Sequence, residues 1–243
     1  MLITGGTGGL GSYIASSLLK AGHKVTVTGR NIKILETMKQ QGIQTIYWDM
    51  ASGEDIPAAI TFDQFDVIIL NAGIGYFKNH HELSKLEIDN MILVNMTIPI
   101  QLATIHSRHF QQRGEGHLVF IGSLAGKMAT PKASVYAATK HALDGYVQGL
   151  RMELQDSSVQ ISIIHPGPID TPFIDKADTT GNYKKALGSH LLSIEEVAEK
   201  VLDVLEKPKG EVLIPGYLGV LAKLTKVFPL TVEKWGRRFY AKK

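Results

Sequence analysis

The chain has 243 residues, 44% of them hydrophobic, and a formal net charge of +3. This length and composition are ordinary for one α/β domain with a full hydrophobic core, and the mild charge gives no indication of a nucleic-acid partner. The sequence holds no cysteine, which excludes disulfides, a thiol nucleophile and a cysteine-based zinc site.

Short apolar runs alternate with segments of helical periodicity along the chain. We predict strands at residues 2–3, 24–28, 44–48, 66–70, 117–121, 160–164 and 211–214, and helices at 10–21, 31–41, 84–112, 134–155 and 194–206. Strands joined through helices form right-handed parallel units whose sheet is buried on both faces. The predicted fold is therefore α/β, with a doubly wound, mostly parallel Rossmann sheet of about seven strands and helices on both faces.

A glycine-rich run, Thr4-Gly5-Gly6-Thr7-Gly8-Gly9-Leu10-Gly11, separates the first strand from the first helix. Strand, glycine turn and helix in this order form the fingerprint of a dinucleotide-binding site. The glycines let the backbone approach a pyrophosphate closely, and the helix N-terminus offers it unpaired N–H groups and a partial positive charge. We therefore expect this loop to bind a dinucleotide cofactor.

The end of the second predicted strand bears on the choice between NAD and NADP. An NAD-selective site places an acidic residue about 20 residues past the fingerprint, where it binds the ribose 2′-hydroxyl. Here Gly29 stands at that place and Arg30 follows. The missing carboxylate removes repulsion against a 2′-phosphate, and a guanidinium adds a planar charged partner. The pattern favours NADP(H); if Arg30 is only a solvated surface residue, NAD(H) remains open.

Tyr136 and Lys140 lie four residues apart in a predicted helix and therefore share one face. An ammonium group beside a phenol favours the phenolate and lowers a pKa that is otherwise about 10. Such a phenol serves as a proton donor and acceptor near neutral pH. Ser123 precedes Tyr136 by thirteen positions, and its hydroxyl can hydrogen-bond a substrate oxygen brought to the same point.

Together these residues resemble the short-chain dehydrogenase/reductase (SDR) family, from about Leu2 to about Pro215. Further landmarks of the family appear in order, at Asp49, Asn71-Ala72-Gly73, Asn95, Gly122-Ser123, and Pro166-Gly167 with Thr171. The resemblance implies a single NAD(P)-binding Rossmann domain over residues 1–215 that includes the active site. The first strand is shorter than is usual in the family, so we expect the native start to lie upstream of Met1.

The resemblance also implies roles for individual residues. Tyr136 would protonate a carbonyl oxygen or deprotonate an alcohol, and Ser123 would orient that oxygen and stabilise its charge. Lys140 would bind the nicotinamide ribose and hold down the pKa of Tyr136, while Asn95 would position a water in a proton relay. The implied cofactor-binding residues are Gly5, Thr7, Gly9, Leu10, Gly11, Arg30, Asp49, Asn71, Ala72, Gly73, Tyr136, Lys140, Pro166, Gly167 and Thr171.

The expected activity is that of an NADP(H)-dependent carbonyl reductase or alcohol dehydrogenase, acting on a small-molecule carbonyl or alcohol that is lipid-like or a 3-oxoacyl compound. The alternative is a non-catalytic, NADPH-binding regulatory or scaffold protein that kept the fold. Intact Asn95, Ser123, Tyr136 and Lys140 favour the enzyme. In the family, the helices at 84–112 and 134–155 form a two-fold four-helix interface, so we expect a homodimer or homotetramer.

Nine histidines raise the question of a metal site. His106 and His109 have helical spacing, but no H-E-x-x-H motif or carboxylate cluster accompanies them, so we expect surface residues and no metal. His165 ends a predicted strand and is expected to serve packing. Residues 173–190 show no clear period and correspond to the mobile substrate loop of the family.

The C-terminal segment, residues 216–243, carries seven basic residues against one acidic residue, Glu233. Its apolar residues fit two helical stripes: Leu218, Leu221, Leu224, Val227 and Phe228, and then Val232, Trp235, Phe239 and Tyr240. We favour a helix pair that covers the substrate cleft or a subunit contact. The alternative is an amphipathic element on an anionic membrane surface. No apolar run approaches about 18 residues, so we expect a cytoplasmic protein, peripheral to a membrane in the second case.

Overall fold

The computed structural model of the chain describes residues 1–62, 64–219, 225, 227–231 and 234. Across this part, seven parallel strands form one sheet with the order β3-β2-β1-β4-β5-β6-β7. The strands are β1 (Leu2–Ile3), β2 (Thr26–Gly29), β3 (Gln44–Tyr47), β4 (Val67–Leu70), β5 (Gly116–Ile121), β6 (Val159–Pro166) and β7 (Glu211–Ile214). The strand order reverses beside β1, and ligands of such sheets bind beyond the carboxyl ends of the strands at that point.

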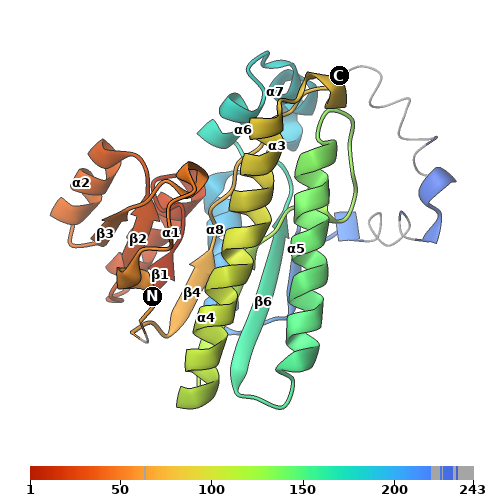
Figure 1. The fold of residues 1–243 in the computed structure, drawn as a ribbon. Helices are drawn as coiled ribbons and strands as arrows, with labels where there is room; N and C mark the ends of the chain where they lie inside the picture. Colours follow the sequence, from red (N-terminus) through yellow and green to blue (C-terminus); the bar gives the residue numbers. More distant parts are fainter. Residues whose placement is uncertain (63, 220–224, 226, 232–233, 235–243) are drawn as a thin grey trace.

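Helices cover both faces of the sheet (Figure 1). On one face, α4 (Ile98–Arg113) and α5 (Ser134–Glu153) pack against strand residues such as Leu2, Ile68 and Phe120. On the other, α1 (Gly9–Lys20), α2 (Ile32–Gln40) and α8 (Ile194–Glu206) pack against the alternate residues, among them Ile3 and Ile69. Because successive strand side chains point to opposite faces, the continuous apolar runs supply both cores. The predicted fold class is confirmed.

A long helix from Lys85 to Arg113 passes in front of the sheet. It consists of α3 (Lys85–Ile92), a π-helical turn (Leu93–Thr97) and α4. By length and composition this helix, among the described residues, could cross a membrane. Its buried residues, including Val94, Ile98 and Leu102, instead pack into the core against the sheet. It therefore serves here as a core helix of the domain.

Two expectations about local structure were wrong. The segment 173–190 contains two short helices, α6 (Pro172–Ala177) and α7 (Asn182–Leu187), although its sequence shows no helical period. His106 is buried rather than exposed, and its ring packs between Phe65 and Phe110 with centroid distances of 6.1 and 6.2 Å. The apolar neighbours come from distant parts of the chain or from the buried side of α4, which the spacing of the histidines does not reveal.

The two stripes predicted for the C-terminal segment lie largely outside the described residues. Of the described residues in that segment, Tyr217, Val227, Phe228 and Leu230 are exposed. Both interpretations of the segment therefore stay predictions.

Candidate active site

The predicted catalytic residues meet beyond the carboxyl ends of β4 and β5. Ser123 follows β5 in an extended conformation, and its hydroxyl oxygen accepts a hydrogen bond from the amide of Ala125 at 3.0 Å. Tyr136 lies in the first turn of α5, and the Ser123 hydroxyl hydrogen-bonds its phenol. Two hydroxyl groups from different elements are thus brought to one point.

Aromatic side chains enclose the Tyr136 ring. The ring centroids of Phe77 and Phe173 lie 5.6 and 5.8 Å from that of Tyr136, and Tyr183 stacks obliquely on Phe77 at 4.8 Å. Burial raises the pKa of Tyr136 to about 12, and the hydrogen bond from Ser123 offsets only part of this rise. Tyr136 therefore carries its proton at neutral pH.

Lys140 does not lower the pKa of Tyr136 in this structure, contrary to expectation. Its Nζ lies 5.9 Å from the centroid of the Tyr136 ring and donates a hydrogen bond to the carbonyl oxygen of Ile121 at 3.0 Å. Burial lowers the pKa of Lys140 to about 8. The i, i+4 spacing placed both side chains on one face correctly, but the end of strand β5 takes the hydrogen bond of the ammonium group.

Asn95 is fully buried in the π-helical turn, a feature that is frequent at functional sites. Its Oδ1 accepts from the amide of Ile74 at 2.9 Å, and its Nδ2 donates to the carbonyl of Ile74 at 2.8 Å and to Thr139 Oγ1 at 3.1 Å. Thr139 in turn donates to the carbonyl of Tyr136 at 2.7 Å. Asn95 thus ties the segment after β4 to α5; its role in positioning a water stays a prediction.

Thr139 was missed by the sequence analysis, as was Thr4. Thr4 Oγ1 accepts from the amides of Asn71 and Ala72 at 3.0 and 3.1 Å, and Asn71 Nδ2 donates to the carbonyl of Thr4 at 2.9 Å. These bonds join the glycine-rich loop to the Asn71-Ala72-Gly73 segment. The available signals were local: Thr4 directly precedes Gly5, and Thr139 follows Tyr136 by three residues in the same helix.

The glycine-rich loop has the geometry of a phosphate site. Gly5 has a φ of +66°, and a Cβ there would come 2.9 Å from the Cα of Ala72, so glycine is required. Within the described residues, the N-terminus of α1 has no side-chain cap and no acidic residue in its first turn. Its amide groups and partial positive charge are therefore available to an anion. These residues fit the dinucleotide that the sequence implies.

Thr171, another predicted cofactor residue, lies against this loop, and Pro166 and Gly167 lie at the end of β6. A Cβ on Gly9 would touch the Thr171 methyl group at 3.1 Å, so Thr171, which precedes α6, lies against the start of α1. Pro166 ends β6, and the amide of Gly167 donates to the carbonyl of Ile214 at 2.7 Å. Pro166 and Gly167 thus lie at the carboxyl end of β6.

The far end of the site lies after β2. A Cβ on Gly29 would come 2.5 Å from the side chain of Thr7, so the fold leaves no room for an acidic residue at position 29. Arg30 is half exposed and its Nη1 lies 3.6 Å from Asp49 Oδ1. Asp49 also accepts from the amide of Ala51 at 3.1 Å. An exposed pair of this kind is weak, so the guanidinium can exchange Asp49 for a better anion.

A cleft opens at the predicted substrate loop, next to Phe77, whose ring contacts Tyr136. Asp178 shapes its wall, because its carboxylate accepts from the hydroxyl of Thr180 at 2.6 Å and from the amide of Tyr183 at 2.6 Å. The amide of Phe77 donates to the carbonyl of Ala177 at 2.7 Å. The cleft is lined by Phe77, Pro131, Lys132, Asp178, Thr180, Asn182 and Tyr183.

The buried ammonium group of Lys140 should lower stability at neutral pH. Below pH 8 the lysine is charged in both the folded and the unfolded chain, so the full cost of burying the charge is present. As pH rises from about 8 toward 10.5, the folded chain loses this proton first and the cost disappears. We predict that Lys140→Met raises the free energy of unfolding at pH 7 by on the order of 1–3 kcal/mol, and that the gain shrinks as pH rises.

Denaturant titrations between pH 7 and 9.5 measure this gain, with exposed Lys39→Met as the matched control. A Lys140→Met protein that is less stable than the wild type by the same amount at every pH would contradict the prediction.

Comparisons with known proteins agree with this geometry. Residues 1–181 match the family model described as short chain dehydrogenase. Dehydrogenase/reductase SDR family member 7B of Rattus norvegicus is 33% identical over 245 residues, which cover 91% of this chain and 75% of that protein. The uncharacterized oxidoreductase YxnA of Bacillus subtilis (strain 168) is 30% identical over 96% of this chain and 70% of its own length.

Solved structures show the same fold. The closed form of a serine dehydrogenase complexed with NADP+ superimposes with a TM-score of 0.76 at 26% identity, over 88% of this chain and 94% of that one. A short-chain dehydrogenase from Sphingobium yanoikuyae in complex with NADPH gives a TM-score of 0.80 at 22% identity, over 97% and 93%. The family model matches residues 1–181, which are most of this chain. The chain therefore belongs to the short-chain dehydrogenase/reductase family and is an oxidoreductase acting on CH–OH or C=O groups.

Proposed function

We propose that this protein is an NADP(H)-dependent carbonyl reductase or alcohol dehydrogenase whose substrate is an apolar carbonyl or alcohol compound, lipid-like or 3-oxoacyl in type. The observation that carries the proposal is the meeting of the Ser123 and Tyr136 hydroxyls inside an aromatic enclosure. A binding or scaffold protein has no need of this pair, and membership of an oxidoreductase family makes that alternative the less favoured one.

In the proposed reaction, a substrate oxygen lies between the two hydroxyls. Ser123 orients it and stabilises the charge that develops on it. Tyr136 holds a proton at neutral pH, because burial raises its pKa to about 12, and can donate it to the carbonyl oxygen. The buried Lys140 lies one helical turn away, with its Nζ 5.9 Å from the centroid of the Tyr136 ring. The hydride would come from NADPH when it is bound, and the protein would supply placement and electrostatics.

The side chains that surround Tyr136 support the proposed substrate class. Phe77, Phe173 and Tyr183 offer apolar and aromatic surface around the Tyr136 ring. Burying an apolar chain there gains free energy in proportion to its area, and it keeps water from the hydroxyl pair. These contacts support an apolar group next to the carbonyl carbon.

The NADP(H) preference rests on the groups at the end of β2. Thr7 packs against the Cα of Gly29, where any larger side chain would have to begin, and Arg30 is half exposed with the carboxylate of Asp49 near it. A guanidinium so placed suits a 2′-phosphate. The similar serine dehydrogenase was solved with NADP+, which supports the same choice.

We further propose that residues 1–215 act as one domain, since the strands of a single sheet extend from Leu2 to Ile214. A cytoplasmic location is proposed on composition alone. The basic C-terminal segment is proposed to cover the cleft or a subunit contact, with binding to an anionic membrane as the alternative.

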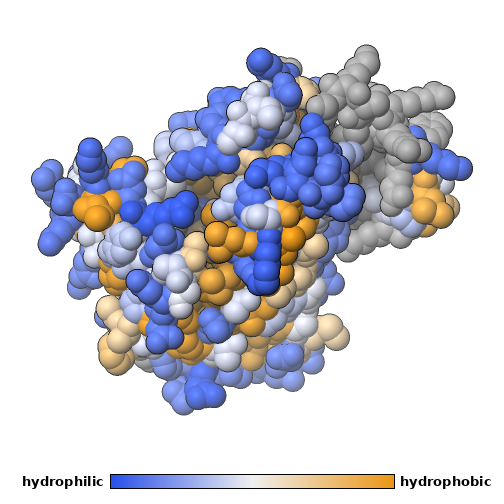
Figure 2. All heavy atoms as spheres, turned by 45° about the horizontal axis from the view of Figure 1, so that its top comes forward, coloured by the Kyte–Doolittle hydropathy of each residue, from blue (hydrophilic) through white to orange (hydrophobic). Residues whose placement is uncertain are grey.

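The outer face of α5 supports a homodimer, or a homotetramer built from it. Its exposed stripe consists of small and flexible residues: Ala138, Ala142, Gly145 and Met152. Figure 2 shows hydrophobic residues among polar ones on the lower part of the view. A two-fold axis would pair this stripe with its own copy.

The first prediction of the proposal concerns Tyr136. Tyr136→Phe keeps the ring and removes the proton, so we expect kcat to fall by about 10²-fold or more while NADPH still binds. The assay is NADPH oxidation with a panel of aldehydes, ketones and 3-oxoacyl compounds. Tyr146→Phe is the matched control, because Tyr146 lies on the same helix but packs on Phe120. Near-normal turnover in Tyr136→Phe would contradict the assignment of Tyr136 as the proton donor.

The second prediction concerns Arg30. Arg30→Ala should weaken NADPH binding by roughly 1.5–3 kcal/mol, because the charge-assisted bonds to the 2′-phosphate are lost. NADH binding should change little. Fluorescence titration with both cofactors measures this, with exposed Lys33→Ala on α2 as a control for the loss of one charge. An equal loss for NADH would show that Arg30 acts through its pair with Asp49 instead.

The third prediction concerns assembly. We expect at least a dimer at micromolar concentration, and Gly145→Arg should convert it to a monomer. Nothing lies within 4 Å of a Cβ at Gly145, so the subunit itself should tolerate the arginine, which also suits a helix better than glycine. Light scattering measures the mass, with exposed Gln40→Arg on α2 as the charge-matched control. A wild-type monomer, or an unchanged mass in Gly145→Arg, contradicts the prediction.

A further inference from the structure

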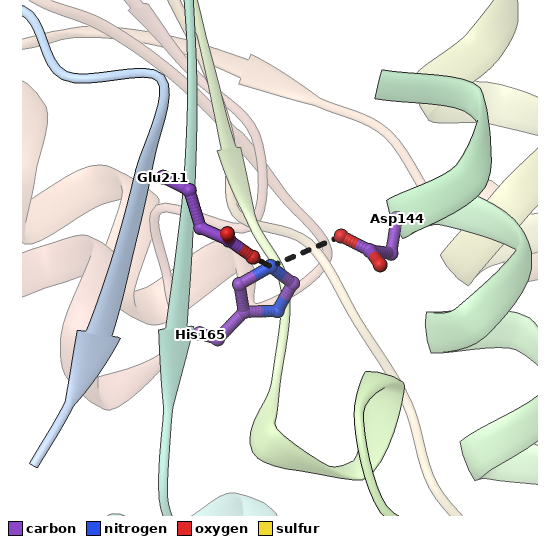
Figure 3. Close-up of side chains that lie close together, drawn as sticks. All are labelled: Asp144, His165 and Glu211. Carbon is purple, nitrogen blue, oxygen red and sulfur yellow. Dashed lines mark ion pairs between the residues drawn. The ribbon is translucent and has the colours of Figure 1, made fainter. Parts of the chain in front are cut away.

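A cluster of four charged or titratable side chains lies behind the backbone of Ser123. They are Lys127 after β5, Asp144 of α5, His165 of β6 and Glu211 of β7. Figure 3 shows His165 between the two carboxylates. Its Nε2 lies 3.3 Å from Asp144 Oδ1 and 3.4 Å from Glu211 Oε1. Lys127, Asp144 and His165 are buried, and Glu211 is partly exposed.

The cluster already contains a cationic side chain, Lys127. The ligand atoms of Asp144, His165 and Glu211 lie within 4.8 Å of one another, as in a metal site. Lys127 Nζ, however, lies 2.7 Å from Asp144 Oδ1 and 2.5 Å from Glu211 Oε1. A divalent ion among these oxygens would stand against the ammonium group. The cluster is therefore a network of ion pairs rather than a metal centre.

The network holds Asp144 in its ionised form. Burial raises the pKa of Asp144, but the hydrogen bonds and charges of His165 and Lys127 outweigh burial and hold this pKa well below its ordinary value. The second carboxylate oxygen accepts from Gln148 Nε2 at 2.9 Å. Asp144 is therefore an ionised anchor on α5 throughout the neutral range, with both oxygens engaged.

His165 connects this anchor to the backbone of Ser123. Its Nδ1 lies 3.1 Å from the carbonyl oxygen of Ser123. A carbonyl oxygen only accepts, so Nδ1 donates to it. A Cβ on Gly122 would come 2.6 Å from Nδ1, so the imidazole lies directly against the backbone that leads into Ser123. The expectation that His165 serves only packing was incomplete.

Lys127 holds the other end of the same short segment. Its amide donates to the carbonyl of Leu124 at 2.9 Å, in the turn whose Ala125 amide is capped by the Ser123 hydroxyl. Ser123 is thus linked to Asp144 through His165, and the turn after it is linked to Asp144 through Lys127. Asp144 follows Lys140 by four residues and Tyr136 by eight, on the same buried side of α5.

We propose that His165 is a positioning residue which, with Asp144, Lys127 and Glu211, fixes the main chain of Ser123 relative to helix α5 and so holds the Ser123 hydroxyl at Tyr136. This inference rests on the proposed function of Ser123. The chain offers a matched control in His117, a buried histidine of β5 whose Nε2 lies 2.8 Å from Ser162 Oγ.

The first test needs no substrate. Hydrogen exchange is measured by mass spectrometry over residues 122–128 in the full-length protein. His165→Leu should speed exchange there by about 10-fold, because the segment loses one of its two links to Asp144. His165→Asn, whose amide can still donate to the Ser123 carbonyl, should restore most of the protection, and His117→Leu should leave it unchanged. Unchanged protection in His165→Leu overturns the proposal.

The second test is a double-mutant cycle with Ser123→Ala, using the carbonyl compound that best supports NADPH oxidation. His165→Leu should lower kcat by roughly 10- to 100-fold when Ser123 is present and by less than about 2-fold in the Ser123→Ala protein, where no hydroxyl remains to be misplaced. NADPH affinity should stay unchanged. If His165→Leu does not fold, Glu211→Gln replaces it in the cycle, with a smaller loss expected.

The outcomes distinguish a failure of the positioning role of His165 from a failure of the proposed function. Equal losses in both backgrounds mean that His165 acts through general stability, which overturns the positioning role. A loss in Ser123→Ala without a loss in His165→Leu also overturns it and leaves the proposed function standing. Full activity in Ser123→Ala refutes the proposed function itself.

Discussion

The buried polar side of helix α5 is the constraint on which the rest of the structure depends. A phenol, an ammonium group and a carboxylate follow one another at four-residue spacing, at Tyr136, Lys140 and Asp144, and all three are buried. Buried polar groups are tolerated only where they find partners. The partners lie at the carboxyl ends of the strands. They are Ser123, the carbonyl of Ile121, and the cluster around His165. Packing α5 on the sheet therefore assembles the site.

The same burial acts in opposite directions on the two titratable groups of that stripe. It raises the pKa of Tyr136 to about 12 and lowers the pKa of Lys140 to about 8. In both cases the neutral form gains, so the phenol keeps its proton while the ammonium group stands closer to losing one. Burial thus keeps Tyr136 protonated as a proton donor, and the buried charge of Lys140 lowers the stability of the fold. Such a cost is common where function requires buried charge.

The parts of the site that are local in sequence were predictable. The glycine-rich loop, the spacing of Tyr136 and Lys140, and the alternation of strands and helices each have a short-range pattern with a physical meaning. The features that the sequence did not reveal depend on contacts between distant segments. The role of Asn95 in the π-helical turn depends on its hydrogen bonds to Ile74 and Thr139, which are distant in sequence. The ion network joins residues from four elements, and the direction of the Lys140 ammonium group is decided by Ile121.

In the proposed dimer, helix α5 would connect the active site to the subunit contact. Asp144 and Gly145 are adjacent, yet one anchors the buried network and the other lies in the exposed stripe with open space around it. Successive helical residues point about 100° apart, so a helix can present two unrelated faces with little compromise. A subunit contact on the exposed stripe would bear on the same rigid element that carries Tyr136 and Lys140. The small residues of that stripe let a partner helix approach closely, while the ion network on the opposite side resists displacement of the helix relative to Ser123.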